Sequence, residues 1–160
     1  MLGRTKTPLP TIPMKISASV KSTTERHEVL VSTAGNAQSL EVPMKSAGKG
    51  SSVNGGEFLM LALATCYCND IYREAARMSI QVTSVEVEAT ADFEGIGLAA
   101  NNVRYSARIE SNESQDRIEQ LLRETDAVAE IQNTVRSATK VTLVPWGATD
   151  AACIAAQSAA

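Results

Sequence analysis

The chain has 160 residues, of which 44% are apolar and 21% are charged, and its formal net charge is −3. These values are typical of a globular protein and exclude a disordered or fibrous one. Its 15 basic residues are scattered among 18 acidic ones without forming a dense basic stripe, which argues against nucleic acid as a partner.

Hydropathy and cysteine content indicate the cellular compartment of the protein. The longest nearly continuous apolar run, over residues 58–68, is too short to span a bilayer, so no membrane partner is predicted. Residues 1–13 lack the hydrophobic region of a secretion signal. The three cysteines are an odd number without the pattern of a disulfide scaffold. We therefore expect a reduced, cytoplasmic protein whose thiols matter individually.

The first forty residues predict a small antiparallel sheet. Residues 1–13 hold three prolines and are interpreted as an extended arm. Alternating apolar and polar residues predict a strand over 14–21, a second over 26–32 and a short third over 39–43. The Ala-Gly-Asn sequence at 34–36 predicts the turn between the last two strands.

A long helix is predicted over residues 55–78. It follows a segment rich in glycine and serine, residues 46–56, which is a candidate for a loop over a site. Asn54 can cap the helix, and Glu57, three residues later, completes a capping-box pattern. The first half of the helix is apolar on every side, which predicts that it is buried all round.

The rest of the chain alternates between strand and helix patterns. Strands are predicted over 80–91 and 103–109, helices over 113–127 and about 128–135, and a last short strand over 141–145. The alternation slips between Val82 and Val85, which predicts a bulge. Asn112 and Gln115 form the predicted cap of the first of these helices.

This order of elements is α+β, with the long helix at its centre. We expect an N-terminal arm over residues 1–13, a single domain over 14–148 and an Ala-rich tail over 149–160.

Two of the cysteines lie on the long helix but face different surroundings. At about 100° per residue, Cys66 falls near Asp70 and Arg73, whereas Cys68 falls roughly 160° away on an apolar side. Cys68 is interpreted as a small core residue. Nearby cations lower the pKa of a thiol and apolar burial raises it, so Cys66 is the candidate reactive thiol. A structural role is the alternative, since a helical cysteine often only fills space.

A metal site and a catalytic triad are not predicted. Cys66 and Cys68 point apart on a helix and cannot both bind one ion. His27, the single histidine, would be the sole candidate base of a triad and is interpreted as an ordinary residue of the small sheet. No cofactor is expected.

The segment from Asn54 to Cys66 (NGGEFLMLALATC) resembles the central helix of the OsmC/Ohr family, the osmotically inducible protein C and organic hydroperoxide resistance proteins. The family helix opens near a Pro-x-Glu-Leu sequence and reaches Ala-x-Cys about nine residues later. Here Glu57 precedes Cys66 by nine, and the following elements match in order. The resemblance, which covers roughly residues 14–145, implies an intertwined homodimer of OsmC-like α+β subunits with thiol sites at the subunit interface. It also implies thiol-dependent reduction of organic hydroperoxides.

The resemblance suggests roles for three residues. Cys66 would attack the peroxide and become a sulfenic acid. Glu57 matches the family carboxylate in some branches only, and helix capping is the other interpretation of this residue. The activating arginine of the family lies in the N-terminal sheet, where Arg26 is the nearest candidate and a solvated strand charge is the alternative.

The chain departs from the family at the second cysteine. Family peroxidases carry it in a Cys-Pro-Val or Cys-Pro-Ile motif on the later helix, where this chain has Ala129. Cys68 lies on the wrong helix face, and Cys153 would have to fold back from the tail. The chain is therefore interpreted as a one-Cys peroxidase recycled by an external thiol or dithiol. The alternatives are a relative that binds small molecules without turnover and a dimeric scaffold.

Overall fold

A computed structural model describes residues 14–148, which belong to two compact units. Of the described residues, one unit contains 14–52 and 143–148, and the other runs from Val53 to Thr142. The expected arm, the expected tail and Cys153 lie outside the described residues.

The first unit contains a three-stranded antiparallel sheet in the order β1-β2-β3. Its strands are β1 (Ile16–Ser22), β2 (His27–Thr33) and β3 (Asn36–Leu40). Ala34 and Gly35 both have positive φ, 50° and 85°, as a two-residue hairpin turn that matches strand twist requires. The predicted sheet and turn are confirmed, although β3 begins and ends earlier than the predicted third strand.

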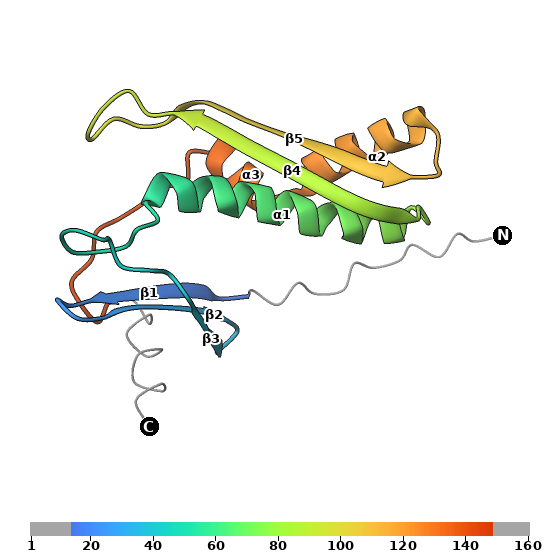
Figure 1. Cartoon of the computed structure of the whole chain (residues 1–160). Helices are drawn as coiled ribbons and strands as arrows, with labels where there is room; N and C mark the ends of the chain where they lie inside the picture. The colour runs from blue at the N-terminus through green and yellow to red at the C-terminus, as the bar shows by residue number, and fades with distance from the viewer. Residues whose placement is uncertain (1–13, 149–160) are drawn as a thin grey trace. The chain divides into compact units, whose positions relative to one another are not determined.

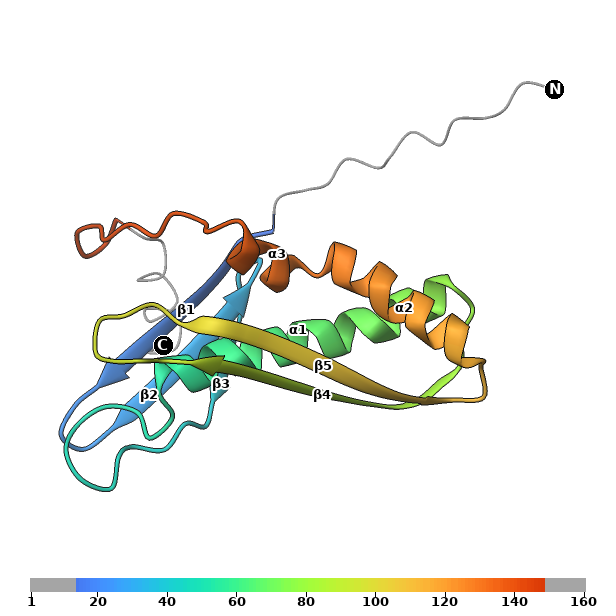
Figure 2. The same cartoon turned by 90° about the horizontal axis from the view of Figure 1, so that it is seen from above.

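The second unit places helices on one face of a hairpin. Helix α1 (Gly55–Arg77) runs along the antiparallel strands β4 (Val82–Asp92) and β5 (Asn101–Ser111). Helices α2 (Gln115–Val128) and α3 (Glu130–Arg136) pack beside α1, as Figures 1 and 2 show. The α+β prediction and its element order are confirmed up to α3.

The predicted capping box starts α1. The Asn54 side chain accepts a hydrogen bond from the Glu57 backbone N–H at 3.0 Å, and the Glu57 carboxylate accepts one from the Asn54 N–H at 2.7 Å. These two bonds satisfy backbone donors that have no partner within the helix.

Replacing Asn54 with alanine should lower the free energy of unfolding by about 1 kcal/mol, because the helix loses its cap. Urea denaturation followed by circular dichroism measures this change. Asn69→Ala, at an exposed position in the middle of α1, is the control and should change stability by less than about 0.5 kcal/mol. Equal losses in the two variants would contradict a specific capping role.

The β4–β5 hairpin alternates half-buried and exposed residues along both strands. Its inward side chains, among them Val85, Val87 and Tyr105, pack against the core of the helices. The register shifts between Val82 and Ser84, which confirms the predicted bulge. A bulge locally increases the twist of a strand, so it helps the hairpin to follow α1.

The core of this unit lies where α1 meets α2. Its buried residues are Tyr67, Ile71, Ala75, Ile80, Leu121 and Ala129. The prediction that the first half of α1 is buried all round is wrong for the chain as described, because Leu61 is 57% exposed. Apolar character around a helix shows that it avoids water but not which molecule covers it.

Two further predictions need correction. Ser114, not Asn112, caps α2, and its side chain accepts from the Arg117 backbone N–H. Residues 141–145 form no strand, since this described segment has no hydrogen-bonded ladder. Apolar alternation predicts which side of a segment faces inward, but a strand also needs a neighbouring strand, which a short sequence window does not reveal.

Candidate functional site

Cys66 lies in the middle of α1 at the point where α3 begins. Its thiol donates a hydrogen bond to Oδ2 of Asp70, one turn later on the same helix, at 3.4 Å. A longer contact of 3.9 Å joins the sulfur to Oε2 of Glu130 in the first turn of α3. The backbone N–H of Ile131 donates to the sulfur as well. Cys66 is thus held by polar groups from two helices.

Arg73 completes this cluster. Its NH1 lies 2.6 Å from Oδ1 of Asp70 and 3.6 Å from Oε1 of Glu130, and its Nε lies 3.3 Å from Oε1 of Glu74. The helix wheel predicted Asp70 and Arg73 on the side of Cys66, and the contact with Asp70 confirms it. The guanidinium is bound by carboxylates, and it fixes the orientation of Asp70.

The surroundings of Cys66 favour the neutral thiol. Burial raises the pKa of Cys66 most, the Ile131 N–H lowers it, and the charges of Asp70 and Glu130 raise it again. Burial also raises the pKa of Asp70, while the donated thiol proton and Arg73 lower it. In the hydrogen bond between them, the Cys66 sulfur is the donor and Oδ2 of Asp70 is the acceptor.

Three potential metal-binding atoms, from Cys66, Asp70 and Glu130, lie within 4.8 Å of one another. Arg73 already places one positive charge against both carboxylates. What the arrangement can do chemically is exchange a proton between sulfur and carboxylate.

The other two residues suggested by the resemblance have partners of their own. Glu57 is nine residues before Cys66 on α1, about 13.5 Å along the helix axis, and its carboxylate is engaged in the cap. Arg26 precedes β2 in the first unit, and its guanidinium pairs with Glu28. Within the second unit, the structure brings Cys66 together with Asp70, Arg73 and Glu130. Catalytic roles for Glu57 and Arg26 stay predictions.

Cys68 has different neighbours, as the helix wheel predicted. It is half-buried and lines a shallow hollow together with Ala64, Thr65, Asn69 and Val87 of β4. It is not part of the buried core, so its interpretation as a core residue needs correction. The polar groups that surround Cys66 are not among the residues that line this hollow.

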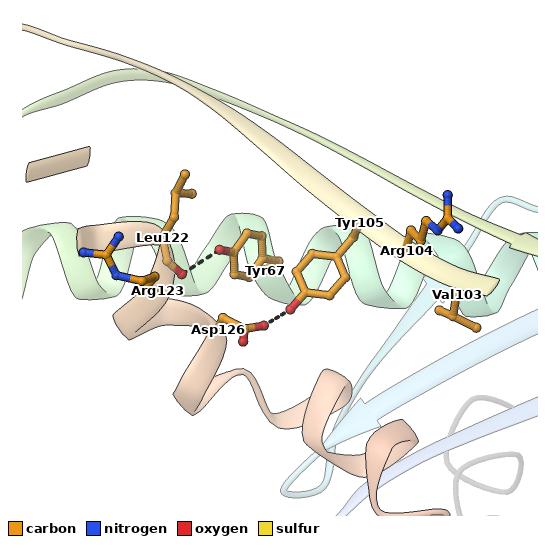
Figure 3. Close-up of a pocket in the computed structure, with 7 residues that line it drawn as sticks. All are labelled: Tyr67, Val103, Arg104, Tyr105, Leu122, Arg123 and Asp126. Carbon is orange, nitrogen blue, oxygen red and sulfur yellow. Dashed lines mark hydrogen bonds between the residues drawn. The ribbon is translucent and has the colours of Figure 1, made fainter. Parts of the chain in front are cut away.

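A separate hollow of about 630 Å³ lies between β5 and α2. Figure 3 shows the rings of Tyr67 and Tyr105 at its centre, and they meet edge to face with centroids 4.9 Å apart. The Tyr67 hydroxyl donates to the Leu122 carbonyl at 2.8 Å, and the Tyr105 hydroxyl donates to Asp126. Burial, with the charge of Asp126, raises the pKa of Tyr67 to about 12. The Tyr67 hydroxyl therefore stays protonated and joins α1 to α2, while the Tyr105 hydroxyl joins β5 to α2.

Residues 48–144 match the model of a protein family described as OsmC-like protein. This match covers more than half of the chain and includes every helix and strand of the second unit. The chain belongs to the OsmC-like family.

Solved structures of other proteins share the fold of this OsmC-like protein. An OsmC-like protein from Mycoplasma pneumoniae is 17% identical, with a TM-score of 0.58 over 84% of this chain and 99% of the other. An organic hydroperoxide resistance protein from Elizabethkingia anophelis is 18% identical, with a TM-score of 0.52 over 80% of this chain and 91% of the other. Organic hydroperoxide resistance protein OsmC from Legionella pneumophila is 17% identical, with a TM-score of 0.51 over 76% of this chain and 89% of the other.

No curated protein matches this OsmC-like protein. Among the residues that the structure describes, none of the helices combines the length and apolar character needed to cross a membrane.

Ala129, where the resemblance places the second cysteine of family peroxidases, is fully buried at the joint between α2 and α3. The next two residues of this OsmC-like protein, Glu130 and Ile131, are the ones that reach Cys66. Sequence reasoning missed both. The available signal was their place beside Ala129, since the family motif already implied that this part of the later helix approaches the reactive thiol.

Proposed function

We propose that this protein reduces organic hydroperoxides through Cys66 and is recycled by an external thiol. The observation that carries the proposal is the setting of Cys66, a half-buried thiol held by Asp70, Glu130 and the Ile131 N–H in a chain of the OsmC-like family. Two of the structural neighbours are described as organic hydroperoxide resistance proteins, which is consistent with this chemistry.

The oxidation consumes one thiol and one hydroperoxide. The Cys66 thiolate attacks the terminal oxygen of the hydroperoxide, a sulfur–oxygen bond forms and the O–O bond breaks. Cys66 becomes a sulfenic acid, and the remaining alkoxide takes up a proton and leaves as an alcohol. Sulfur is oxidised by two electrons and the peroxide is reduced by two.

Because alanine occupies position 129, the α2–α3 region supplies no second cysteine to reduce the Cys66 sulfenic acid, and we propose that an external thiol does so. An external thiol condenses with the sulfenic acid, which releases water and leaves a mixed disulfide at Cys66. A second thiol then attacks this disulfide and restores the Cys66 thiol. A dithiol performs both steps.

The proposal includes a homodimer, as the family resemblance implies. Apolar side chains on α1 support it, since Leu61 is 57% exposed and Tyr72 is 46% exposed in the single chain. Side chains of this size on one helix contribute to stability when a partner covers them. A second subunit would also be able to place a cationic side chain near Cys66.

Treating the reduced protein with one equivalent of cumene hydroperoxide should oxidise Cys66 before Cys68. The polar cluster can accept the proton of Cys66, whereas Cys68 lies beside Val87. Mass spectrometry after trapping with dimedone measures the sulfenic acid formed at each cysteine. In a parallel sample without dimedone, added thiol should convert the sulfenic acid to a mixed disulfide. A protein without prior peroxide treatment is the control.

The alternative function is a dimeric protein that binds a small molecule without turnover. The raised pKa of the Cys66 thiol favours it, because a neutral thiol is a weak nucleophile. A turnover assay separates the two functions. Cumene hydroperoxide that is not consumed in the presence of the protein and excess dithiol would contradict the peroxidase and leave the binding protein as the better explanation.

A further inference from the structure

Reduction of a hydroperoxide by a neutral thiol moves a proton as well as an oxygen. The sulfur must lose its proton before it attacks, and the departing alkoxide must gain one. Asp70 is placed to serve both needs, because its Oδ2 accepts the Cys66 hydrogen bond at 3.4 Å. The Asp70 side chain is only 6% exposed, so bulk water has little access to it.

We propose that Asp70 is the catalytic base and acid of Cys66, taking the thiol proton and returning it to the alkoxide. This inference rests on the proposed peroxidase function. The proton passes from sulfur to Oδ2 as the sulfur attacks the terminal peroxide oxygen. The O–O bond breaks, and the alkoxide receives that proton from the Asp70 carboxyl group. Asp70 ends as the carboxylate with which it began, and the products are Cys66 sulfenic acid and an alcohol.

Two contacts prepare Asp70 for this role. Arg73 binds the other carboxylate oxygen, Oδ1, at 2.6 Å, which leaves Oδ2 directed at the sulfur. The Ile131 N–H remains on the sulfur after the proton has left, and a hydrogen bond to the charged form stabilises it. Arg73 of α1 and the Ile131 N–H of α3 thus fix the orientation of Asp70 and of the Cys66 sulfur relative to each other.

Glu130 is the other carboxylate near the sulfur, and it fits the role less well. Its oxygen lies farther away, at 3.9 Å, and its side chain is 67% exposed. It belongs to a different helix from Cys66, whereas Asp70 is fixed one turn away on the same rigid element. Glu130 therefore serves as the matched control.

A base and a merely repulsive charge give opposite results when they are removed. If Asp70 only repels the thiolate, Asp70→Asn makes more thiolate, and every reaction of Cys66 becomes faster. If Asp70 transfers the proton, the same variant becomes faster with a reagent that needs no acid and slower with a hydroperoxide. Asparagine has the same shape but cannot carry the proton.

The experiment measures two rates at Cys66 near neutral pH in the full chain carrying Cys68→Ser and Cys153→Ser. Iodoacetamide alkylation reports the thiolate, and cumene hydroperoxide, followed by sulfenic-acid trapping, reports the complete reaction. In Asp70→Asn, alkylation should rise several-fold while oxidation falls about 100-fold, the low end for the loss of an acid or base. Glu130→Gln, which removes the more distant carboxylate, should raise alkylation slightly, and its oxidation should fall by far less than that of Asp70→Asn.

Oxidation that rises in step with alkylation in Asp70→Asn would overturn the assignment, as would an equal fall in Glu130→Gln. If Asp70→Asn does not fold, the parent protein still provides the test. Its oxidation should slow in heavy water more than its alkylation does, and equal effects would overturn the proposal. A parent protein whose Cys66 is alkylated but never oxidised by the hydroperoxide refutes the proposed function itself, a result distinct from these.

Discussion

Replacing Cys66 with serine should lower hydroperoxide reduction by at least about 1,000-fold, because a hydroxyl cannot supply the nucleophile that the reaction needs. Serine can still donate a hydrogen bond to Asp70, so the local structure is retained. The measurement is peroxide consumption by the purified protein in the presence of excess dithiol. A melting temperature close to that of the parent protein shows that the variant is folded.

Cys68→Ser is the matched control for this prediction. The two cysteines are separated by one residue on α1 and are both half-buried. Cys66 contacts two carboxylates, whereas none of the described residues that line the hollow with Cys68 carries one. The Cys68 variant should keep more than half of the parent activity. If Cys66→Ser stays active while Cys68→Ser does not, the reactive thiol has been assigned to the wrong helix face and the Asp70 proposal fails with it.

Local rules were sufficient to predict much of the fold. The capping box of Asn54 and Glu57 involves residues three apart, and the bulge near Val82 appears as a slip in a two-residue alternation. Both are properties of a short window of sequence. The order of strands and helices follows from the same rules, and the family resemblance then indicated how the elements pack.

Features that depend on distant residues were not predictable in this way. Glu130 reaches Cys66 from 64 residues away, and no local pattern pairs them. The cap of α2 is a local feature that was nevertheless misplaced by two residues, because Asn112 and Ser114 are both suitable cap residues and the helix begins after the second. The predictions of a fully buried Leu61 and of a strand at 141–145 failed because burial and strand pairing both depend on a neighbouring segment that the local sequence does not specify.

The candidate site shows this difference most clearly. The helix wheel placed Asp70 and Arg73 near Cys66, with Arg73 two turns from the thiol and within reach of Asp70, and the redox interpretation required positive charge from some source near the sulfur. In the structure the guanidinium is bound by Asp70, Glu74 and Glu130. The sulfur is therefore left beside carboxylates, and the sign of the electrostatic effect is reversed. The spacing of Asp70 and Arg73 on one helix already allowed their pairing, whereas the approach of Glu130 depends on three-dimensional geometry.

Helix α2 holds the site together through Leu121, and this is the basis of the largest stability effect that we expect. Leu121 is fully buried in the core cluster with Ile71 and Ala129. Leu121→Ala should lower the free energy of unfolding by about 2–5 kcal/mol, because it removes apolar contacts and leaves a cavity. Urea denaturation measures the loss.

Leu98→Ala is the control, since Leu98 is 58% exposed in the β4–β5 connection and should cost less than about 0.5 kcal/mol. A loss in Leu121→Ala no larger than that of the control would mean that α2 is not anchored as described. Because Ala129 ends α2 and Glu130 begins α3, a loosened α2 also displaces the Ile131 N–H from the sulfur. Leu121→Ala should therefore slow Cys66 oxidation even under conditions in which the protein remains folded, which links the packing of the core to the chemistry of the thiol.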